Sequence, residues 1–240
     1  MTPSNSGVNP PAAIDQTVLI PIDGAELQGD LHVPAGALGL VIFAHGSGSS
    51  RHSPRNRYVA RVLQEHAFGT LLLDLLTIEE EQTESPAGEL RFNINLLAER
   101  LLRASAWARQ NRYTSILPIG YFGASTGSAA ALVAAAREPE DVKAIVSRGG
   151  RPDLAGAYLS KVQAPTLLIV GGDDTFVIRL NREAMKYMVA ECRLEIIPGA
   201  THLFEEPGTL EKVAELATDW FVRYMTTPKH GEAKSAHHSR

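Results

Sequence analysis

Residues 117–136 read LPIGYFGASTGSAAALVAAA, and this stretch decides the fold. An apolar run at 117–122 leads into a G-x-S-x-G pattern at 123–127, which opens a run of small, helix-forming residues. A serine on such a sharp strand-to-helix turn has a strained backbone, tolerated only if the residues two positions away lack bulky side chains. The two glycines meet that requirement, so we predict a strand, a turn that raises Ser125 clear of the sheet, and a helix.

Short apolar runs recur on both sides of this motif. Near-continuous runs of this kind are typical of strands buried on both faces of a parallel sheet, and longer segments with helical spacing separate them. The expected buried strands are residues 40–44, 70–73, 117–122, 144–147, 166–170 and 194–197. The expected helices are residues 55–65, 92–110, 127–137, 153–160, 178–189 and 209–225.

An antiparallel start precedes this alternation. Residues 18–22 and 27–33 have the pattern of a hairpin around Asp23-Gly24. The whole order predicts an α/β fold: a doubly wound, mostly parallel sheet of about eight strands, with right-handed crossovers and helices on both faces. Ligands in such sheets bind at the carboxyl ends of the strands, so candidate functional residues are those in the loops that follow.

Charge and composition exclude several classes of partner. The 240 residues contain 23 Lys and Arg against 27 Asp and Glu, a net charge of −4, and no long basic run. We therefore expect no nucleic-acid partner and no anionic membrane surface. Because no stretch is apolar enough to span a membrane and the first residues do not look like an export signal, we expect a cytoplasmic location.

Cysteine and histidine placement makes a metal or a disulfide framework unexpected. Cys192 is the single cysteine, which excludes an internal disulfide, and no Cys/His cluster has the spacing of a structural zinc site. His237 and His238 are adjacent, but we interpret them as part of a solvated tail because they lack supporting ligands.

The two ends of the chain differ from its middle. Residues 1–16 and 227–240 are rich in small, polar and proline residues and have no apolar period, so we expect flexible segments there. One folded domain is expected between them, at residues 17–226.

A serine nucleophile needs a general base, and the base needs an acid that fixes its tautomer. Both residue types follow later expected strands. The sequence GGDDTFV at 171–177 follows one strand, and His202 follows the last one. The order serine, aspartate, histidine predicts Ser125 as nucleophile and His202 as base, with either Asp173 or Asp174 as the acid.

These residues make the chain resemble the α/β-hydrolases over about residues 17–226. Its compact form, without an evident cap domain, resembles the dienelactone hydrolase-like group within them. The family pattern G-x-x-D-x-x-V matches Gly171, Asp174 and Val177, so the resemblance implies Asp174 as the acid. Named dienelactone hydrolases use a cysteine nucleophile, whereas the elbow here holds Ser125, which favours ordinary ester chemistry.

The loop HGSGSS at 45–50 follows an expected strand and resembles the family's His-Gly loop. The resemblance implies that the backbone N–H groups of Ser47 and Thr126 face the oxyanion of a tetrahedral intermediate. We interpret His45 as structural, a buried imidazole bonded within its own loop, because His202 already supplies a base.

Several arginines follow the same strand ends. Arg51, Arg148 and Arg151 are candidates for binding a carboxylate or phosphate on the substrate, because guanidinium groups bind such anions bidentately. The alternative is that these arginines, with Arg55 and Arg57, pair with an acidic loop. The acidic residues of that loop are Asp74, Glu79, Glu80 and Glu81.

Together these features predict a serine esterase that acts on small or short-chain esters through an acyl-enzyme, without a metal or an organic cofactor. Residues 149–161 alone separate two strands at the active-site edge, which leaves little room for a lid. The alternatives are a thioesterase or acyltransferase that uses the same triad, and a catalytically silent binding protein with this fold. The small ester substrate is the expected partner, and the sequence indicates no oligomeric state.

Overall fold

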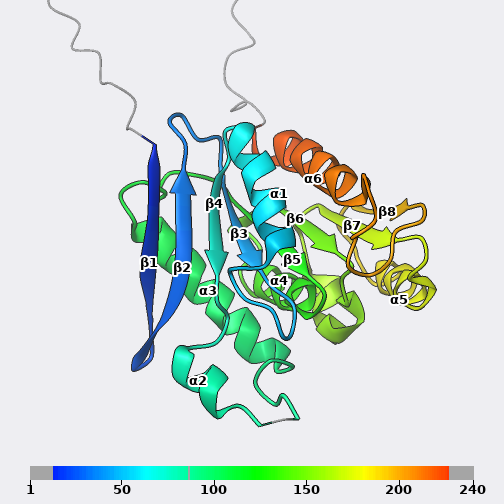
Figure 1. The fold of residues 1–240 in the computed structure, drawn as a ribbon, viewed down its shortest axis with the longest axis horizontal. Helices are drawn as coiled ribbons and strands as arrows, with labels where there is room; N and C mark the ends of the chain where they lie inside the picture. Colours follow the sequence, from blue (N-terminus) through cyan, green and yellow to red (C-terminus); the bar gives the residue numbers. More distant parts are fainter. Residues whose placement is uncertain (1–12, 86, 227–240) are drawn as a thin grey trace, which may run out of the picture.

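The computed structural model describes residues 13–226 apart from residue 86 (Figure 1). The strands are β1 (Ile14–Ile22), β2 (Ala25–Val33), β3 (Leu40–Ala44), β4 (Gly69–Leu73), β5 (Ile119–Ala124), β6 (Val142–Arg148), β7 (Thr166–Gly171) and β8 (Cys192–Ile197). They form one sheet in the order β1-β2-β4-β3-β5-β6-β7-β8. β1 pairs antiparallel with β2, β2 pairs antiparallel with β4, and the remaining pairs are parallel. The expected fold class is confirmed.

The helices cover both faces of this sheet. They are α1 (Pro54–Glu65), α2 (Ile78–Thr83), α3 (Ile94–Gln110), α4 (Thr126–Arg137), α5 (Thr175–Met185) and α6 (Thr209–Met225), with a 3-10 segment η1 (Pro152–Lys161). In Figure 1, α1 and α6 lie side by side on one face, and α3 and α4 lie on the other. Every residue of β3, β4, β5 and β7 is buried, because apolar side chains of these strands meet helices on both sides.

Local signals in the sequence explain where the helices beside the site begin. The side chain of Ser53 accepts a hydrogen bond from the backbone N–H of Asn56, and Pro54 occupies the first position of α1. Asp174 caps α5 in the same way, through the N–H of Val177. Both caps lie in loops at the carboxyl ends of strands, so the residues that start these helices also shape the site.

Three helical segments differ from the sequence-based expectation. α2 lies where only an acidic loop is expected: Thr77 and Glu80 form a capping box there, but α2 has no buried residue and hence no apolar period to reveal it. The helix expected at 153–160 is the 3-10 segment η1, because Gly156 has a φ of 53° that interrupts helical geometry. The helix expected at 178–189 begins earlier, at Thr175, where Asp174 caps it.

The N-terminal strand is longer than expected. β1 starts at Ile14, which pairs with Val33 of β2, so the domain boundary expected at residue 17 falls inside this strand. The turn of the expected hairpin is confirmed, since Gly24 has a left-handed φ of 78°. Residues 1–12 and 227–240, where the flexible ends are expected and where His237 and His238 fall, lie outside the described residues. Between residues 13 and 226, we find no helix whose length and hydropathy would suit a membrane span.

Candidate active site

Ser125 lies on the turn between β5 and α4, with a φ of 51° and a ψ of −120°. Left-handed backbone of this kind is strained for a residue with a side chain, and it persists only where the surroundings impose it. A Cβ at position 127 would lie 2.3 Å from the carbonyl oxygen of Ala44, and one at position 123 would lie 2.4 Å from the Cα of Ser128. The glycines of the motif are thus required by packing, and the predicted strand, turn and helix are confirmed.

The two other residues of the predicted triad meet at the ends of β7 and β8. Nδ1 of His202 lies 2.7 Å from Oδ2 of Asp174, while Oδ1 of Asp174 accepts a hydrogen bond from the N–H of Val177 at 3.3 Å. The helix cap therefore fixes the carboxylate that orients the imidazole. Of the two adjacent aspartates, Asp174 makes this contact. When Nδ1–H donates this hydrogen bond to Asp174, Nε2 carries no proton and is the nitrogen that can act as a base.

The end of β6 and the loop that follows it contact both Ser125 and His202. The N–H of Ser125 donates to the carbonyl oxygen of Arg148, and the N–H of Arg151 donates to the carbonyl oxygen of Ser125, both at 3.2 Å. Gly149 has a φ of 52°, and a Cβ there would lie 3.4 Å from Nδ1 and Cε1 of His202. The structure thus brings Ser125, Asp174 and His202 to one edge of the sheet, around this loop.

The loop after β3 approaches the elbow from the other side. A Cβ at Gly46 would lie 3.0 Å from the Cβ of Ser125. The N–H of Ser47 donates to the Thr126 hydroxyl oxygen at 2.9 Å. The two residues expected to supply oxyanion donors therefore lie in contact, but the Ser47 N–H already has an acceptor, which an incoming oxyanion would have to replace.

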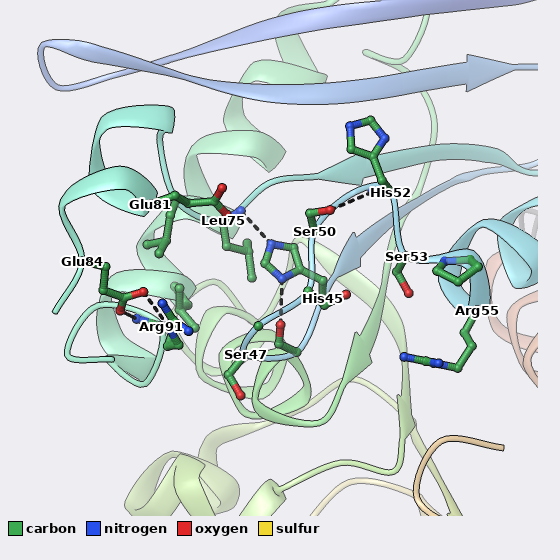
Figure 2. Close-up of a pocket in the computed structure, with 16 residues that line it drawn as sticks. His45, Ser47, Ser50, His52, Ser53, Arg55, Leu75, Glu81, Glu84 and Arg91 are labelled. Carbon is green, nitrogen blue, oxygen red and sulfur yellow. Dashed lines mark hydrogen bonds and ion pairs between the residues drawn. The ribbon is translucent and has the colours of Figure 1, made fainter. Parts of the chain in front are cut away.

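His45 lies buried in this loop, with 7% of its surface exposed (Figure 2). Its Nδ1 lies 2.9 Å from the carbonyl oxygen of Gly46, and its Nε2 accepts a hydrogen bond from the N–H of Leu75 at 3.1 Å. These partners require a neutral ring with its proton on Nδ1. Burial lowers the pKa of His45 below its ordinary value. The structural interpretation is confirmed: His45 joins the loops after β3 and β4.

A pocket of about 540 Å³ lies against the loop after β3. Figure 2 shows Glu84 and Arg91 at one end of this pocket, which we call the serine-loop pocket, and Arg55 at the other. Glu84 and Arg91 form an ion pair at 2.5 Å. Because Gly46 lines the pocket and also abuts Ser125, the pocket adjoins the predicted nucleophile.

Two of the three candidate substrate-binding arginines are held in ion pairs. Arg51 binds Asp74 through its backbone N–H and its guanidinium, and it lies 3.5 Å from Asp30. Arg151 binds Asp153 through two hydrogen bonds of 2.9 and 2.8 Å. Pairing with the acidic loop is therefore confirmed for Arg51, but it is wrong for Arg151, whose partner lies in η1.

Arg148 is the exception. It is 6% exposed, its guanidinium donates to the side-chain oxygen of Asn56 at 3.3 Å, and it lies 5.9 Å from the centre of the Phe204 ring. Within the described residues no carboxylate pairs with it, so the expected pairing with the acidic loop is wrong here too. Burial lowers the pKa of Arg148 to about 10, and the nearby charge of Arg55 adds to this effect.

Two residues that no sequence pattern singles out hold the loops of the site. Glu206 accepts hydrogen bonds from the hydroxyl and the N–H of Thr201, at 2.6 and 3.1 Å, next to His202. Asn181 of α5 donates to the carbonyl oxygen of Gly150 at 3.0 Å. A buried amide on a helix and a glutamate in a loop are common in proteins, so neither residue could be identified without the fold.

Comparison with known proteins places this geometry in context. The model of the dienelactone hydrolase family matches residues 33–229. A crystal structure of dienelactone hydrolase from Anabaena variabilis ATCC 29413 is 56% identical and has a TM-score of 0.87, covering 89% of this chain and 99% of that one. An α/β serine hydrolase without lid from Xanthomonas campestris is 19% identical, with a TM-score of 0.70 over 92% of this chain and 98% of that one, and it shares the fold.

Two curated relatives are longer proteins. They come from Mycobacterium tuberculosis strains CDC 1551 / Oshkosh and ATCC 25618 / H37Rv, and their names describe them provisionally as phosphoribosyl transferases. Each is 53% identical over 224 residues, which is 93% of this chain and 49% of the relative. The chain therefore spans about half the length of these relatives.

The elbow packing can be tested with Gly127→Ala. Because the new methyl group would collide with the Ala44 carbonyl, we expect a loss of about 1–3 kcal/mol in the free energy of unfolding, measured by urea denaturation, together with loss of any esterase activity. The matched control is Gly36→Ala, which adds strain at a φ of 71° but meets no atom within 4 Å. Full activity in Gly127→Ala would contradict this account of the elbow.

The buried His45 predicts a pH dependence of stability. Its folded-state pKa lies below the unfolded value, so between these two values the unfolded chain binds more protons and stability falls as the pH drops. His45→Gln keeps a donor and an acceptor but does not titrate, so its loss of stability between pH 7.5 and 5.5 should be smaller than that of wild type. The difference is at most about 1.4 kcal/mol per unit of pKa shift. His66→Gln, an exposed position, is the control, and equal slopes in all three proteins would contradict the prediction.

Proposed function

This chain belongs to the dienelactone hydrolase family, and we propose that it is a serine hydrolase that cleaves small carboxylic esters through an acyl-enzyme. The observation that carries the proposal is the meeting of three groups around the loop after β6. These are Ser125 on its strained elbow, the His202 ring against Gly149, and the carboxylate of Asp174 at 2.7 Å from that ring. A nucleophile, a base and an orienting acid in this order are the parts that acyl transfer requires.

The proposed reaction proceeds in two steps. Ser125 Oγ attacks the ester carbonyl carbon while Nε2 of His202 takes the hydroxyl proton, and the same nitrogen then gives that proton to the departing alcohol. In the second step Nε2 of His202 takes a proton from water, whose oxygen attacks the acyl carbon, and the same nitrogen then returns a proton to Ser125 Oγ as the acid is released. Asp174 accepts a hydrogen bond from the Nδ1–H group throughout and remains ionised, so it keeps the ring oriented and stabilises the imidazolium form.

The developing oxyanion is assigned to the backbone N–H groups of Ser47 and Thr126. Thr126 is the first residue of α4, where N–H groups lack partners within the helix and the helix dipole favours negative charge. The Ser47 N–H donates to the Thr126 hydroxyl, so that bond must be exchanged for one to the oxyanion. Such rearrangement on substrate binding is common, since catalytic hydrogen bonds often tighten only in the complex.

Serine rather than cysteine chemistry is supported by the surroundings of Cys192. Its thiol lies 3.4 Å from the Met188 sulfur, and burial raises its pKa to about 12. A thiol in that state is protonated at neutral pH and is a poor nucleophile. Ester hydrolysis by Ser125 is therefore the reaction we assign, in place of the cysteine-dependent reaction of named dienelactone hydrolases.

Small esters fit the access to the site. One 3-10 segment, η1, connects β6 to β7, and this connection adds no separate lid domain. The serine-loop pocket is lined by the backbone and hydroxyl groups of residues 45–50 and by Leu75, Leu76 and Leu97, a short apolar surface that suits a small acyl group. Short-chain esters are therefore the substrates with which to begin.

Three alternatives to ester hydrolysis remain from the sequence. Thioester hydrolysis and acyl transfer would use the same residues, whereas silent binding would not. A thioesterase and an acyltransferase need the same triad, and product analysis with competing alcohols and amines separates transfer from hydrolysis. A silent binding protein would need neither the strained elbow nor the Asp174–His202 contact. We assign no phosphoribosyl transfer to this chain, because it spans about half the length of the relatives with that name and its triad geometry serves carbonyl chemistry.

The proposal predicts the kinetics of Ser125→Ala and His202→Ala. With p-nitrophenyl acetate and butyrate, wild type should turn over, and stopped flow should show a burst approaching one nitrophenol per site if deacylation is slower than acylation. Each substitution should lower kcat at least about 10³-fold, because triad members act as a unit. Ser160→Ala and His66→Ala, both at exposed positions, should leave turnover unchanged. Turnover that survives Ser125→Ala would remove the elbow from the mechanism.

A further inference from the structure

The side chain of Thr126 lies beside the predicted nucleophile but does not serve the helix that it begins. Thr126 is the first residue of α4 and is 5% exposed. Its Oγ1 accepts the Ser47 N–H at 2.9 Å, from a residue 79 positions away in the chain. Among residues 13–226 apart from residue 86, its own O–H proton has no acceptor. A buried donor without an acceptor needs a physical explanation.

The loop after β3 directs the Ser47 N–H at this hydroxyl. The carbonyl group of Gly46 belongs to the same peptide unit as that N–H, and in a trans peptide the two point in opposite directions. The Gly46 carbonyl oxygen accepts the Ser49 N–H at 3.2 Å and lies 2.9 Å from Nδ1 of the buried His45 (Figure 2). These bonds fix the peptide unit, so the direction of the Ser47 N–H is set before a substrate binds.

This hydrogen bond adjoins the atom that is proposed to react. A Cβ at Gly46 would lie 3.0 Å from the Cβ and 3.8 Å from the Oγ of Ser125, and Thr126 follows Ser125 directly. When Ser125 Oγ attacks an ester, the carbonyl oxygen stays bonded to the attacked carbon, next to Oγ. The Ser47 N–H and the Thr126 hydroxyl therefore border the space in which the negative charge develops.

A hydroxyl group can change from acceptor to donor by rotation about its C–O bond, because it carries one proton and two lone pairs. In the free protein, the Thr126 oxygen accepts the N–H that the proposed function gives to the oxyanion. Once the oxyanion takes over the Ser47 N–H, the hydroxyl is released and its proton can turn to the negative oxygen. Hydrogen bonds from O–H to a charged oxygen are short and strong.

We propose that the Thr126 side chain is a third oxyanion donor and hence a catalytic residue of the ester hydrolysis. Its Oγ1–H joins the backbone N–H groups of Ser47 and Thr126 around the tetrahedral oxygen. The alternative is that the hydroxyl only occupies the Ser47 N–H and competes with the oxyanion for it. This inference rests on the proposed function, because the oxyanion forms only if Ser125 attacks a carbonyl carbon.

The test removes the hydroxyl while keeping the shape of the side chain. In Thr126→Val a methyl group replaces Oγ1, and kcat/KM for p-nitrophenyl acetate should fall about tenfold or more. The loss should appear in kcat rather than KM, because the hydrogen bond to the oxyanion exists only in the transition state. Thr126→Ser keeps the hydroxyl, so its kcat/KM should exceed that of Thr126→Val by about tenfold or more.

The matched control is Thr218→Val in α6. Thr218 is 4% exposed, and its hydroxyl donates to the carbonyl oxygen of Ala214 in the same helix at 2.8 Å. This variant loses a buried hydroxyl from the same residue type and should keep the wild-type kcat/KM. Thermal melting shows whether each variant folds. If Thr126→Val does not fold, Thr126→Ser and Thr126→Ala, which differ by one oxygen atom, repeat the comparison.

Trifluoroacetophenone separates oxyanion binding from packing, because it forms a stable analogue of the tetrahedral intermediate. Ser125 Oγ adds to its carbonyl carbon and the hydroxyl proton passes to Nε2 of His202, which leaves a hemiketal oxyanion. The inhibition constant should rise in Thr126→Val by about the factor by which kcat/KM falls. The pH profile of kcat/KM should keep its wild-type midpoint, because the contact between Asp174 and His202 is unchanged.

Three results would overturn the proposal. A kcat/KM of Thr126→Val equal to or above that of wild type would make the hydroxyl a competitor of the oxyanion. Equal losses in Thr126→Val and Thr126→Ser, or an inhibition constant that Thr126→Val leaves unchanged, would show that the hydroxyl does not bind the oxyanion. If wild type neither cleaves an ester nor reacts with a fluorophosphonate, the proposed function itself fails, and this inference fails with it.

Discussion

The left-handed backbone of Ser125 is the constraint on which the site depends. A strained residue of this kind costs about 1–3 kcal/mol, so its neighbours must impose it. They do so from three sides. The carbonyl oxygen of Ala44 in β3 lies where a side chain at position 127 would be, and α4 begins directly after Ser125. The last residue of β6 accepts the Ser125 N–H, and the loop after β6 donates to the Ser125 carbonyl oxygen. The loops after β6 and β3 also contact His202 and Thr126. The contacts that impose the Ser125 conformation therefore also position the proposed base and a proposed oxyanion donor.

The buried polar groups around this elbow fall into two kinds. His45 is satisfied: both ring nitrogens have backbone partners, and burial keeps it neutral, so it acts as a tie between two loops. Arg148 is not satisfied, because it is a buried cation that meets an amide and a ring rather than a carboxylate. The contrast between these two residues, both beside the site, is that both ring nitrogens of His45 are paired while the Nε of Arg148 is not.

Most of the fold could be predicted from the sequence, because strands buried on both faces leave continuous apolar runs and the elbow needs its glycines. The failures have physical reasons. α2 buries nothing and so has no apolar period, and η1 is interrupted by a glycine whose conformation a pattern does not reveal. Asp173 and Asp174 are equivalent by residue type; the family pattern selects Asp174, and the start of α5 at Thr175 accompanies the contact of that carboxylate with His202. The partners of Arg148 and Arg151 come from distant or irregular segments, where residue type alone does not fix pairing.

The central claim is that Ser125 is a nucleophile activated by His202. The most direct measurement is reaction of the folded protein with a fluorophosphonate, followed by intact mass and peptide mapping. The account predicts one adduct per chain, on Ser125, with a labelling rate that falls at least about 10³-fold in His202→Ala, because the serine then lacks its base. A protein that stays unlabelled, or an adduct on Ser125 that forms equally fast without His202, would contradict it.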